Sequence, residues 1–319
     1  MEKFRMMIIA ELQKLLGEDY ELEAVETRKN NNTVLSGIRI TKHGDKVSPV
    51  VYVDGYFEQC QKTGMTPHMV ADKIAEQLHD NEEIAEFASK LTNYEFVKDM
   101  LSVALVNYDA NREMLQDRPH HSFLDLAVVY YINARVNDEI KGSINVTYDW
   151  LSKWHIDERT LAEQSFKNLL HANMNFVTDL CGMAHIVSME DMDEDLCELW
   201  EEIKEDALGS SYIFSNEDHH YGASILLNTP LLDRFATDHN ANLIIYPSSV
   251  HEIIVAFEND ERRKNLSSKD IMYINEHSVL REECLSNSVY IYDREKKEVR
   301  IHEMGAPLIK SMVEESVEC

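Results

Sequence analysis

The first fifty residues change their apolar periodicity once, and this change restricts the fold more than any other feature of the sequence. Apolar residues recur every three or four positions over 4–15, and Gly17 follows, which predicts an amphipathic helix. Apolar and polar residues then alternate over 20–27, 34–41 and 47–53, with turn residues between them. A helix followed by a three-stranded meander indicates an α+β fold, in which helices pack beside antiparallel strands.

The rest of the chain extends this pattern to two lobes of antiparallel strands with packed helices and a mainly helical middle. We predict further helices at 56–62, 66–79, 82–90, 110–115, 150–171, 191–207, 229–239 and 264–277. We predict further strands at 100–108, 142–147, 212–215, 222–228, 243–246, 253–257, 288–293 and 298–302, while 123–133 fits either element. This reading gives an N-terminal α+β lobe at 1–150, a helical connecting region at 151–208 and a C-terminal ββαββαββ-like lobe at 209–319.

The charge balance is strongly acidic and narrows the classes of partner. The chain has 31 lysines and arginines against 58 aspartates and glutamates, a formal net charge of −27. Such a chain repels polyanions unless a local basic patch overrides the total, and the densest basic stretches, 261–264 and 294–297, alternate with acids. We therefore expect no direct nucleic-acid ligand. The excess of acidic residues has three alternative explanations: solubility, docking to a basic protein partner, or mimicry of a nucleic-acid backbone.

One segment concentrates the acidic residues and is the predicted interaction surface. Ser188–Asp191 resembles a capping box, and apolar residues at helical spacing follow, which predicts an amphipathic helix with an acidic outer face. A solvated helix face and a phosphate-like array are the two interpretations of this face. The acidic residues are Glu190, Asp191, Asp193, Glu194, Asp195, Glu198, Glu201, Glu202, Glu205 and Asp206.

Cysteine usage and the N-terminus predict a cytoplasmic protein. The five cysteines are scattered, odd in number and without a C-x-x-C pair, which argues against a disulfide framework and a zinc ribbon. Charged residues interrupt the apolar residues of 1–16, unlike the centre of a signal peptide. The longest apolar stretch, 124–132, is about half of the roughly 20 residues that a spanning helix needs, so we expect no membrane segment.

The segment 247–252 holds the candidate catalytic residues. It lies between two predicted strands, where Ser249 and His251 would share one face, as a serine nucleophile and its base require. No G-x-S-x-G elbow accompanies them, and the alternative is a Pro-Ser-Ser turn with a packed or capping His251. A hydrolase or transferase would draw its site from Ser248, Ser249, His251 and Glu252, joined by His120 and Asp125.

Two histidine doublets, at 120–121 and 219–220, raise the question of a metal site. Neither has H-x-x-x-H spacing, and adjacent residues diverge on both helices and strands. The sequence therefore predicts no metal and no cofactor.

Three stretches carry a resemblance to a known family: 103–115, 119–131 and 246–254. They resemble an uncharacterised domain-of-unknown-function family of gut Firmicutes, often carried on mobile elements, and the C-terminal lobe is faintly similar to YtpQ-like proteins. The resemblance implies a bacterial, cytoplasmic, globular protein and brings no activity. Members tend to have Ile-His-Asn-Ser where this chain has Ile144–Thr147 without a histidine, so the resemblance implies no essential histidine there.

Three functions follow from these features. The first is a non-enzymatic acidic protein-interaction factor of a bacterium or its mobile element. The second is a hydrolase or transferase that uses the segment 247–252. The third is a nucleic-acid mimic that occupies the basic channel of a DNA- or RNA-binding protein.

Overall fold

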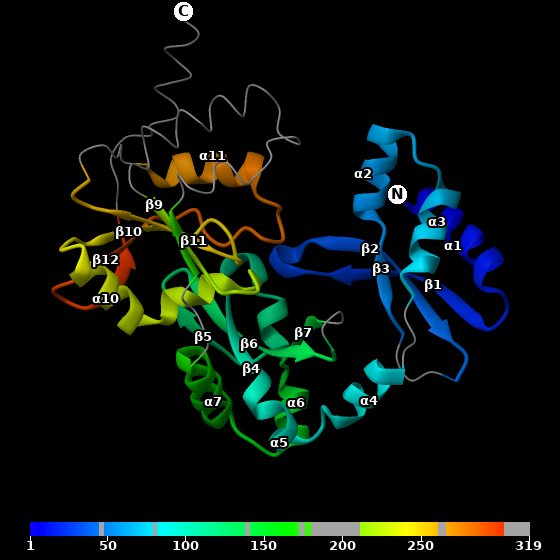
Figure 1. Ribbon diagram of the computed structural model, residues 1–319, viewed down its shortest axis with the longest axis horizontal. Helices are drawn as coiled ribbons and strands as arrows, with labels where there is room; N and C mark the ends of the chain where they lie inside the picture. Colours follow the sequence, from blue (N-terminus) through cyan, green and yellow to red (C-terminus); the bar gives the residue numbers. More distant parts are fainter. Residues whose placement is uncertain are drawn as a thin grey trace, which may run out of the picture. The chain divides into compact units, whose positions relative to one another are not determined.

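The computed structural model describes residues 1–44, 48–78, 82–137, 141–171, 176–179, 211–260 and 266–302, and it confirms an α+β fold with three antiparallel sheets (Figure 1). Contacts divide the chain into two compact units. The N-terminal unit comprises 1–98 and 133–143, and the C-terminal unit comprises 99–132 and 144–319. These units divide the chain at other positions than the predicted boundaries near 150 and 208.

The N-terminal unit contains the predicted helix and meander. Its sheet has the order β1-β2-β3, with β1 and β2 paired antiparallel from Tyr20↔Lys42 to Arg28↔Val34. Its elements are α1 (Glu2–Leu16), β1 (Tyr20–Arg28), β2 (Val34–Lys42), β3 (Val50–Tyr52), α2 (Asp54–Thr63), α3 (Pro67–Glu76), α4 (Glu82–Lys90) and α5 (Tyr94–Val97). Helix α3 begins at the start of the helix predicted at 66–79, where Pro67 takes the first helical position and the Thr66 hydroxyl accepts a hydrogen bond from the Met69 amide at 3.4 Å.

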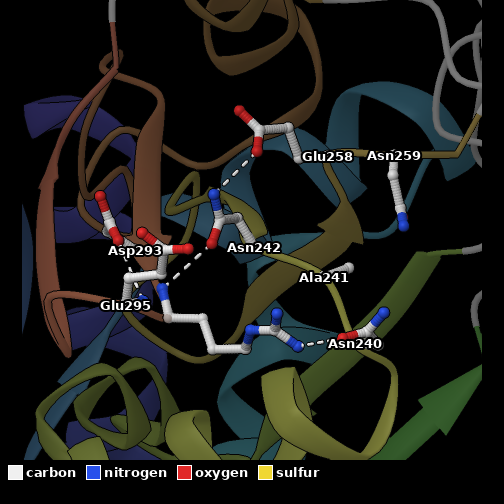
Figure 2. Close-up of a pocket in the computed structure, with 8 residues that line it drawn as sticks. Asn240, Ala241, Asn242, Glu258, Asn259, Asp293 and Glu295 are labelled. Atoms are coloured by element: carbon white, nitrogen blue, oxygen red, sulfur yellow. Dashed lines mark hydrogen bonds between the residues drawn. The ribbon is translucent and has the colours of Figure 1, made fainter.

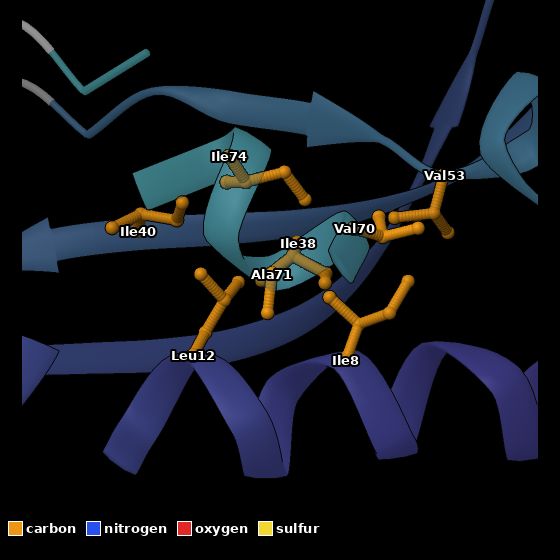
Figure 3. Close-up of a cluster of buried hydrophobic side chains, with 8 residues drawn as sticks. All are labelled: Ile8, Leu12, Ile38, Ile40, Val53, Val70, Ala71 and Ile74. Carbon is orange, nitrogen blue, oxygen red and sulfur yellow. The ribbon is translucent and has the colours of Figure 1, made fainter. Parts of the chain in front are cut away.

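The core of this unit is aliphatic (Figure 3). Ile8 and Leu12 lie one turn apart on α1, so both side chains point to the sheet, and alternation in β2 turns Ile38 and Ile40 towards them. Each of the eight central side chains is at most 1% exposed. The eight are Ile8, Leu12, Ile38, Ile40, Val53, Val70, Ala71 and Ile74.

Most residues of two further sheets lie in the C-terminal unit, while residues 133–135 and 141–143 of these sheets are grouped with the N-terminal unit. One has the order β4-β6-β5, with β7 also paired to β6, and the other has the order β13-β12-β10-β11-β9-β8. The elements of the first are β4 (Leu101–Asn107), β5 (His120–Phe123), β6 (Leu126–Arg135) and β7 (Lys141–Asn145), followed by α6 (Tyr148–Trp154) and α7 (Glu158–His171). Those of the second are β8 (Phe176–Asp179), β9 (Ser211–Ser215), η6 (Gly222–Leu227), α10 (Thr229–Asp238), β10 (Leu243–Tyr246), β11 (Ile253–Phe257), α11 (Ser268–Ser278), β12 (Tyr290–Asp293) and β13 (Glu298–Ile301).

The ambiguous segment 123–133 is mostly strand β6. This strand lies between β4 and β5, and its residues Leu126–Ile132 are at most 4% exposed. Because both faces of the strand are covered, its sequence is a continuous apolar run without the alternation of a half-buried strand.

One predicted strand is wrong. Residues 222–228 were expected to be extended, but Gly222–Leu227 form the 3-10 helix η6. All residues from Gly222 to Leu226 are buried, including the single polar residue Ser224, so no alternation of exposed polar and buried apolar positions reveals the local period. The predicted ββαββαββ order is therefore corrected to β9-η6-α10-β10-β11-α11-β12-β13, and β8, which sequence reasoning missed, pairs with β9. The helix predicted at 110–115 is two short 3-10 turns, Asp109–Asn111 and Met114–Asp117.

No helix within the described ranges is sufficiently long and apolar to span a bilayer.

Candidate functional site

The segment 247–252 connects β10 to β11 and is held by backbone hydrogen bonds to a second loop. The Val250 amide donates to the Glu283 carbonyl at 2.8 Å, and the Leu285 amide donates to the Ser248 carbonyl at 2.9 Å. Ser249 also forms an isolated antiparallel bridge with Cys284. The segment 247–252 is therefore anchored on both sides.

The Ser249 hydroxyl is engaged by its own backbone. It is 6% exposed as a residue, and its Oγ accepts a hydrogen bond from the His251 amide at 3.0 Å. In the part of the chain that the structure describes, no hydrogen bond joins a serine hydroxyl to the His251 imidazole. This geometry matches the turn interpretation of Pro-Ser-Ser, since a nucleophilic serine needs a base within hydrogen-bond reach.

The His251 imidazole is held between a backbone amide and a carboxylate. Its Nδ1 accepts a hydrogen bond from the Tyr221 amide at 3.3 Å, so the proton of the neutral ring is on Nε2. Nε2 lies 3.6 Å from Glu283 Oε1, and the side chain is 24% exposed. Both ring nitrogens therefore face a protein group, which fixes the tautomer and the orientation of the imidazole.

Gly222 allows His251 to lie where it does. A Cβ at this position would lie 2.3 Å from the His251 carbonyl oxygen and 2.1 Å from Ser215 Oγ, closer than atoms can approach. Ser215 Oγ in turn donates to the His251 carbonyl at 2.7 Å. The preceding residue, Tyr221, has a φ of 53°, a left-handed conformation that costs energy for a tyrosine.

Further titratable groups surround this histidine, and we call His220, Tyr221, His251, Glu252 and Glu283 the His251 cluster. The ring of His220 lies 5.7 Å from that of His251, and burial lowers the pKa of His220, an effect that His251 increases. The Nε2 atom of His220 is buried without a hydrogen-bond partner among the described residues. Burial also raises the pKa of Glu252, which His251 partly opposes. Groups with shifted pKa values that converge from several loops are typical of functional sites.

His120 and Asp125 do not join this cluster through any hydrogen bond between described residues. His120 Nδ1 lies 2.9 Å from the Arg118 carbonyl oxygen. Asp125 accepts hydrogen bonds from Ser286 Oγ at 2.6 Å, from Ser288 Oγ at 3.1 Å and from the Tyr290 hydroxyl. With both carboxylate oxygens occupied by hydroxyl donors, Asp125 connects the β5–β6 turn to the loop before β12.

The predicted acidic interaction surface lies outside the described residues, since these include none of the ten acids from Glu190 to Asp206. The electrostatic asymmetry can still be counted along the chain. The N-terminal unit has 19 acidic and 14 basic residues, whereas the C-terminal unit has 39 and 17. Most of the acidic surplus therefore belongs to the C-terminal unit.

A polar pocket, which sequence reasoning missed, lies at the ends of β10, β11 and β12 (Figure 2). Its volume is about 370 Å³. Three carboxylates, three carboxamides and one guanidinium line it. The lining residues are Asn240, Ala241, Asn242, Glu258, Asn259, Asp293, Arg294 and Glu295. The signal in the sequence was the concentration of asparagines and acids just before β10 and at the ends of β11 and β12, which resembles ordinary turn composition.

Hydrogen bonds fix the orientation of several pocket side chains. The Asn242 carboxamide donates through Nδ2 to Glu258 Oε2 at 2.9 Å and accepts from the Arg294 amide at 3.0 Å. Arg294 Nη1 donates to Asn240 Oδ1 at 2.5 Å. The pocket is thus preorganised by its own polar groups.

Within the described ranges, no three histidine, cysteine, aspartate or glutamate side chains are grouped so that they could hold a metal ion. Neither Cys60 nor Cys284 forms a disulfide within the described ranges, and burial raises the pKa of Cys284. A thiol with a raised pKa is a poor nucleophile at neutral pH.

Comparison with known proteins yields one match. The model of a family of unknown function, DUF5688, matches residues 1–294. No curated protein and no solved structure matches the chain.

Proposed function

Because the chain belongs to the DUF5688 family, whose function is unknown, we propose its function from its own residues. We propose that it is a non-enzymatic factor that binds a basic protein partner through the acidic surface of its C-terminal unit. We further propose that it does so in the cytoplasm of a bacterium, as an accessory factor of that bacterium or its mobile element. The scattered cysteines and the family resemblance support this setting.

The observation that carries the proposal is the uneven distribution of charge between the two units. If the acidic surplus served solubility alone, both units would be expected to share it in proportion to their length. The C-terminal unit has about two thirds of the residues and 39 of the 58 acidic residues, but only 17 of the 31 basic residues, so it carries 22 of the 27 surplus negative charges. An acidic surface accelerates encounter with a basic partner and discriminates against acidic ones.

The proposal is tested by cross-linking the tagged full-length protein in host lysate at low and high salt. We expect a lysine- or arginine-rich protein that is lost at high salt and whose cross-links map to the C-terminal unit. Cross-links confined to the N-terminal unit, or capture that salt does not weaken, would contradict the proposal. Displacement of the captured protein by duplex DNA would instead favour the nucleic-acid mimic.

A matched pair of variants isolates the acidic segment. The first neutralises Glu201, Glu202, Glu205 and Asp206 as amides and should weaken capture. The control neutralises four exposed acids of the N-terminal unit, Glu2, Glu18, Glu21 and Glu26, and should leave capture unchanged. Both variants remove the same charge, so equal losses would mean that net charge alone matters.

The geometry of His251 favours a second candidate function, an enzyme with acid–base chemistry. The support is the convergence of titratable groups on His251, where the pKa of His220 is lowered and the pKa of Glu252 is raised by burial. The test is a screen of ester and phosphoester substrates with the wild type and His251→Gln. Turnover that disappears in His251→Gln and persists in Ser249→Ala would support this candidate, and turnover equal in all three proteins would contradict it.

A further inference from the structure

We infer that a pH-sensitive contact holds the loop 216–221 in place: the neutral His251 imidazole accepts a hydrogen bond from the Tyr221 amide and loses this bond when the ring is protonated. Acid then releases the loop from the β4-β6-β5 sheet, against whose apolar cluster Tyr221 packs. The inference goes beyond both candidate functions, because it concerns the position of a loop and holds whether or not His251 takes part in chemistry.

The hydrogen bond exists in only one protonation state of the histidine. A backbone amide can only donate, so Nδ1 of His251 must be unprotonated to accept from Tyr221 at 3.3 Å. An imidazolium has a proton on both nitrogens and no acceptor, so two N–H groups would then face each other. The His251 side chain is 24% exposed, which gives protons access to it. Acid therefore converts an attractive contact into a repulsive one.

Backbone strain favours release of the loop, and hydrogen bonds define which part can move. His219 and Tyr221 have φ values of 49° and 53°, left-handed conformations that cost energy for residues with a Cβ. The Asn216 side chain accepts from one backbone amide of the turn at 3.1 Å and donates to one of its carbonyls at 2.8 Å, so the turn keeps its shape. The Ala223 amide donates to the Val250 carbonyl at 3.2 Å and anchors the chain that follows. The loop 216–221 can therefore leave as a unit while η6 stays in place.

The charges around His251 act in both directions. Glu283 Oε1 lies 3.6 Å from Nε2 and favours the imidazolium, and the neighbouring Glu252 favours it as well. The His220 ring, 5.7 Å away, opposes a second positive charge at this place. Departure of the loop removes His220 and leaves Glu283, so the released form accommodates the imidazolium better. Release is therefore favoured as the pH falls.

His220 adds to the same response. Burial lowers the pKa of His220, an effect that Asp218 partly opposes, and its Nε2 is buried without a hydrogen-bond partner among the described residues. A proton on this ring therefore favours a loop whose histidine is open to water. The further titratable groups near the two imidazoles and their neighbours are His219, Tyr131, Tyr221 and Arg118.

Tyr221 covers part of a buried apolar cluster. Its ring lies 5.0 Å from that of Tyr131, and it packs against the cluster on the β4-β6-β5 sheet. The side chains of this cluster are at most 4% exposed while the loop is in place. The cluster consists of Ala104, Val106, Leu115, Ala127, Val129 and Tyr131. Departure of the loop therefore exposes apolar surface on this sheet.

The experiment measures amide hydrogen exchange of the full-length protein by NMR at pH 8.0 and pH 5.5, expressed as protection factors so that the intrinsic pH dependence of exchange is removed. We expect the protection of the Tyr221 amide to fall about tenfold at pH 5.5, the effect of losing one hydrogen bond. Amides in the β4–β6 pairing should keep their protection, which separates release of the loop from unfolding of the unit. Equal protection of Tyr221 at both pH values, or an equal fall in the β4–β6 amides, would overturn the inference.

A substitution that keeps the acceptor but cannot be protonated tests the role of His251. His251→Asn places a carboxamide oxygen near the position of Nδ1, so the protection of Tyr221 should differ by less than about twofold between the two pH values. His43→Asn replaces an exposed histidine of the N-terminal unit and should retain the full fall. A full fall in His251→Asn would show that another group releases the loop and would overturn the inference.

Glu283→Gln provides a second test that leaves both histidines in place. It removes the carboxylate that favours the imidazolium but keeps the backbone carbonyl that accepts from the Val250 amide. The pH at which the protection of Tyr221 falls should therefore shift to a lower value. A purely structural role of Glu283 would lower the protection equally at all pH values. That result, or a shift to higher pH, would contradict protonation of His251 as the cause of release.

Discussion

The interiors of the two units differ in the kind of contact that stabilises them. The N-terminal unit encloses an aliphatic core in which the central side chains are at most 1% exposed. The C-terminal unit also buries apolar residues, but it adds polar groups, such as Tyr290 bonded to Asp125 and Asn275 bonded to the Ser286 carbonyl. Apolar packing is non-directional, whereas these hydrogen bonds have fixed partners.

The buried polar groups of the C-terminal unit hold two loops in place. The loop 283–288 donates to Asp125 through Ser286 and Ser288, and its backbone pairs with the segment 247–252. The C-terminal unit also has the larger acidic surplus and both candidate sites. The comparison teaches that the N-terminal unit relies mainly on apolar packing, with a few side-chain hydrogen bonds such as that from Arg5 to the Val25 carbonyl, while the C-terminal unit uses directional bonds to hold the loops that carry its candidate chemistry.

The largest expected effect is the loss of a core side chain in the N-terminal unit. Leu12→Ala should lower the free energy of unfolding of this unit by about 3 kcal/mol, because it removes buried methyl groups and leaves a cavity. Hydrogen exchange of the N-terminal amides, compared with those of the C-terminal unit, measures the loss. Leu15→Ala, at a position 45% exposed, is the control and should cost less than about 1 kcal/mol. Equal losses would show that the aliphatic core does not dominate this unit.

The next effect tests the polar interior of the C-terminal unit. Asp125→Ala should lower the free energy of unfolding by about 2 kcal/mol, because three hydroxyl donors lose their acceptor and Tyr290 is fully buried. Trp150 and Trp154 of α6 lie in this unit, so urea unfolding followed by tryptophan fluorescence reports on it. Asp238→Ala, at an exposed site, should change the value by less than about 0.5 kcal/mol. A loss of less than about 0.5 kcal/mol for Asp125→Ala would show that the hydrogen bonds to Asp125 do not stabilise this unit.

A smaller effect compares helix caps between the units. Ser267 caps α11 in a reciprocal capping box with Asp270, which is 1% exposed, whereas Thr66 caps α3 at an exposed position. Ser267→Ala should cost about 1.5 kcal/mol and Thr66→Ala about 0.5 kcal/mol in the free energy of unfolding. Equilibrium denaturation of both variants provides the comparison. If Thr66→Ala lowers the free energy of unfolding as much as Ser267→Ala does, burial of the cap does not change its contribution to stability.

The smallest effect concerns pH. Burial raises the pKa of Glu252 in the folded state, so ionising this carboxyl opposes folding. The penalty is present above the folded pKa and absent below the unfolded value of about 4.5. Glu252→Gln should therefore raise the unfolding temperature at pH 7.5 and leave it unchanged near pH 4. Glu276→Gln, at an exposed site, serves as the control and should show no difference between the two pH values. A lower unfolding temperature for Glu252→Gln at pH 7.5 would mean that the ionised form is needed.

Part of the candidate site could be anticipated from sequence and part could not. The turn residues and the shared face of Ser249 and His251 drew attention to the segment 247–252. Which groups meet the imidazole was decided by chain segments about 30 residues away on either side, since Tyr221 and Glu283 come from other loops. Spacing within one segment carries no information about such partners.

Local features determined by the sequence alone were the elements with clear periodicity and caps. The helix over 4–15, the meander after it, and α10 with its Asn228 cap and Pro230 all followed from interactions within a few residues. Tertiary structure alone decided the rest. It turned the buried run after Tyr221 into a 3-10 helix, brought Asp125 to Tyr290 across 165 positions, and grouped 133–143 with the N-terminal unit. These outcomes depend on contacts between distant segments, whose energies no local pattern records.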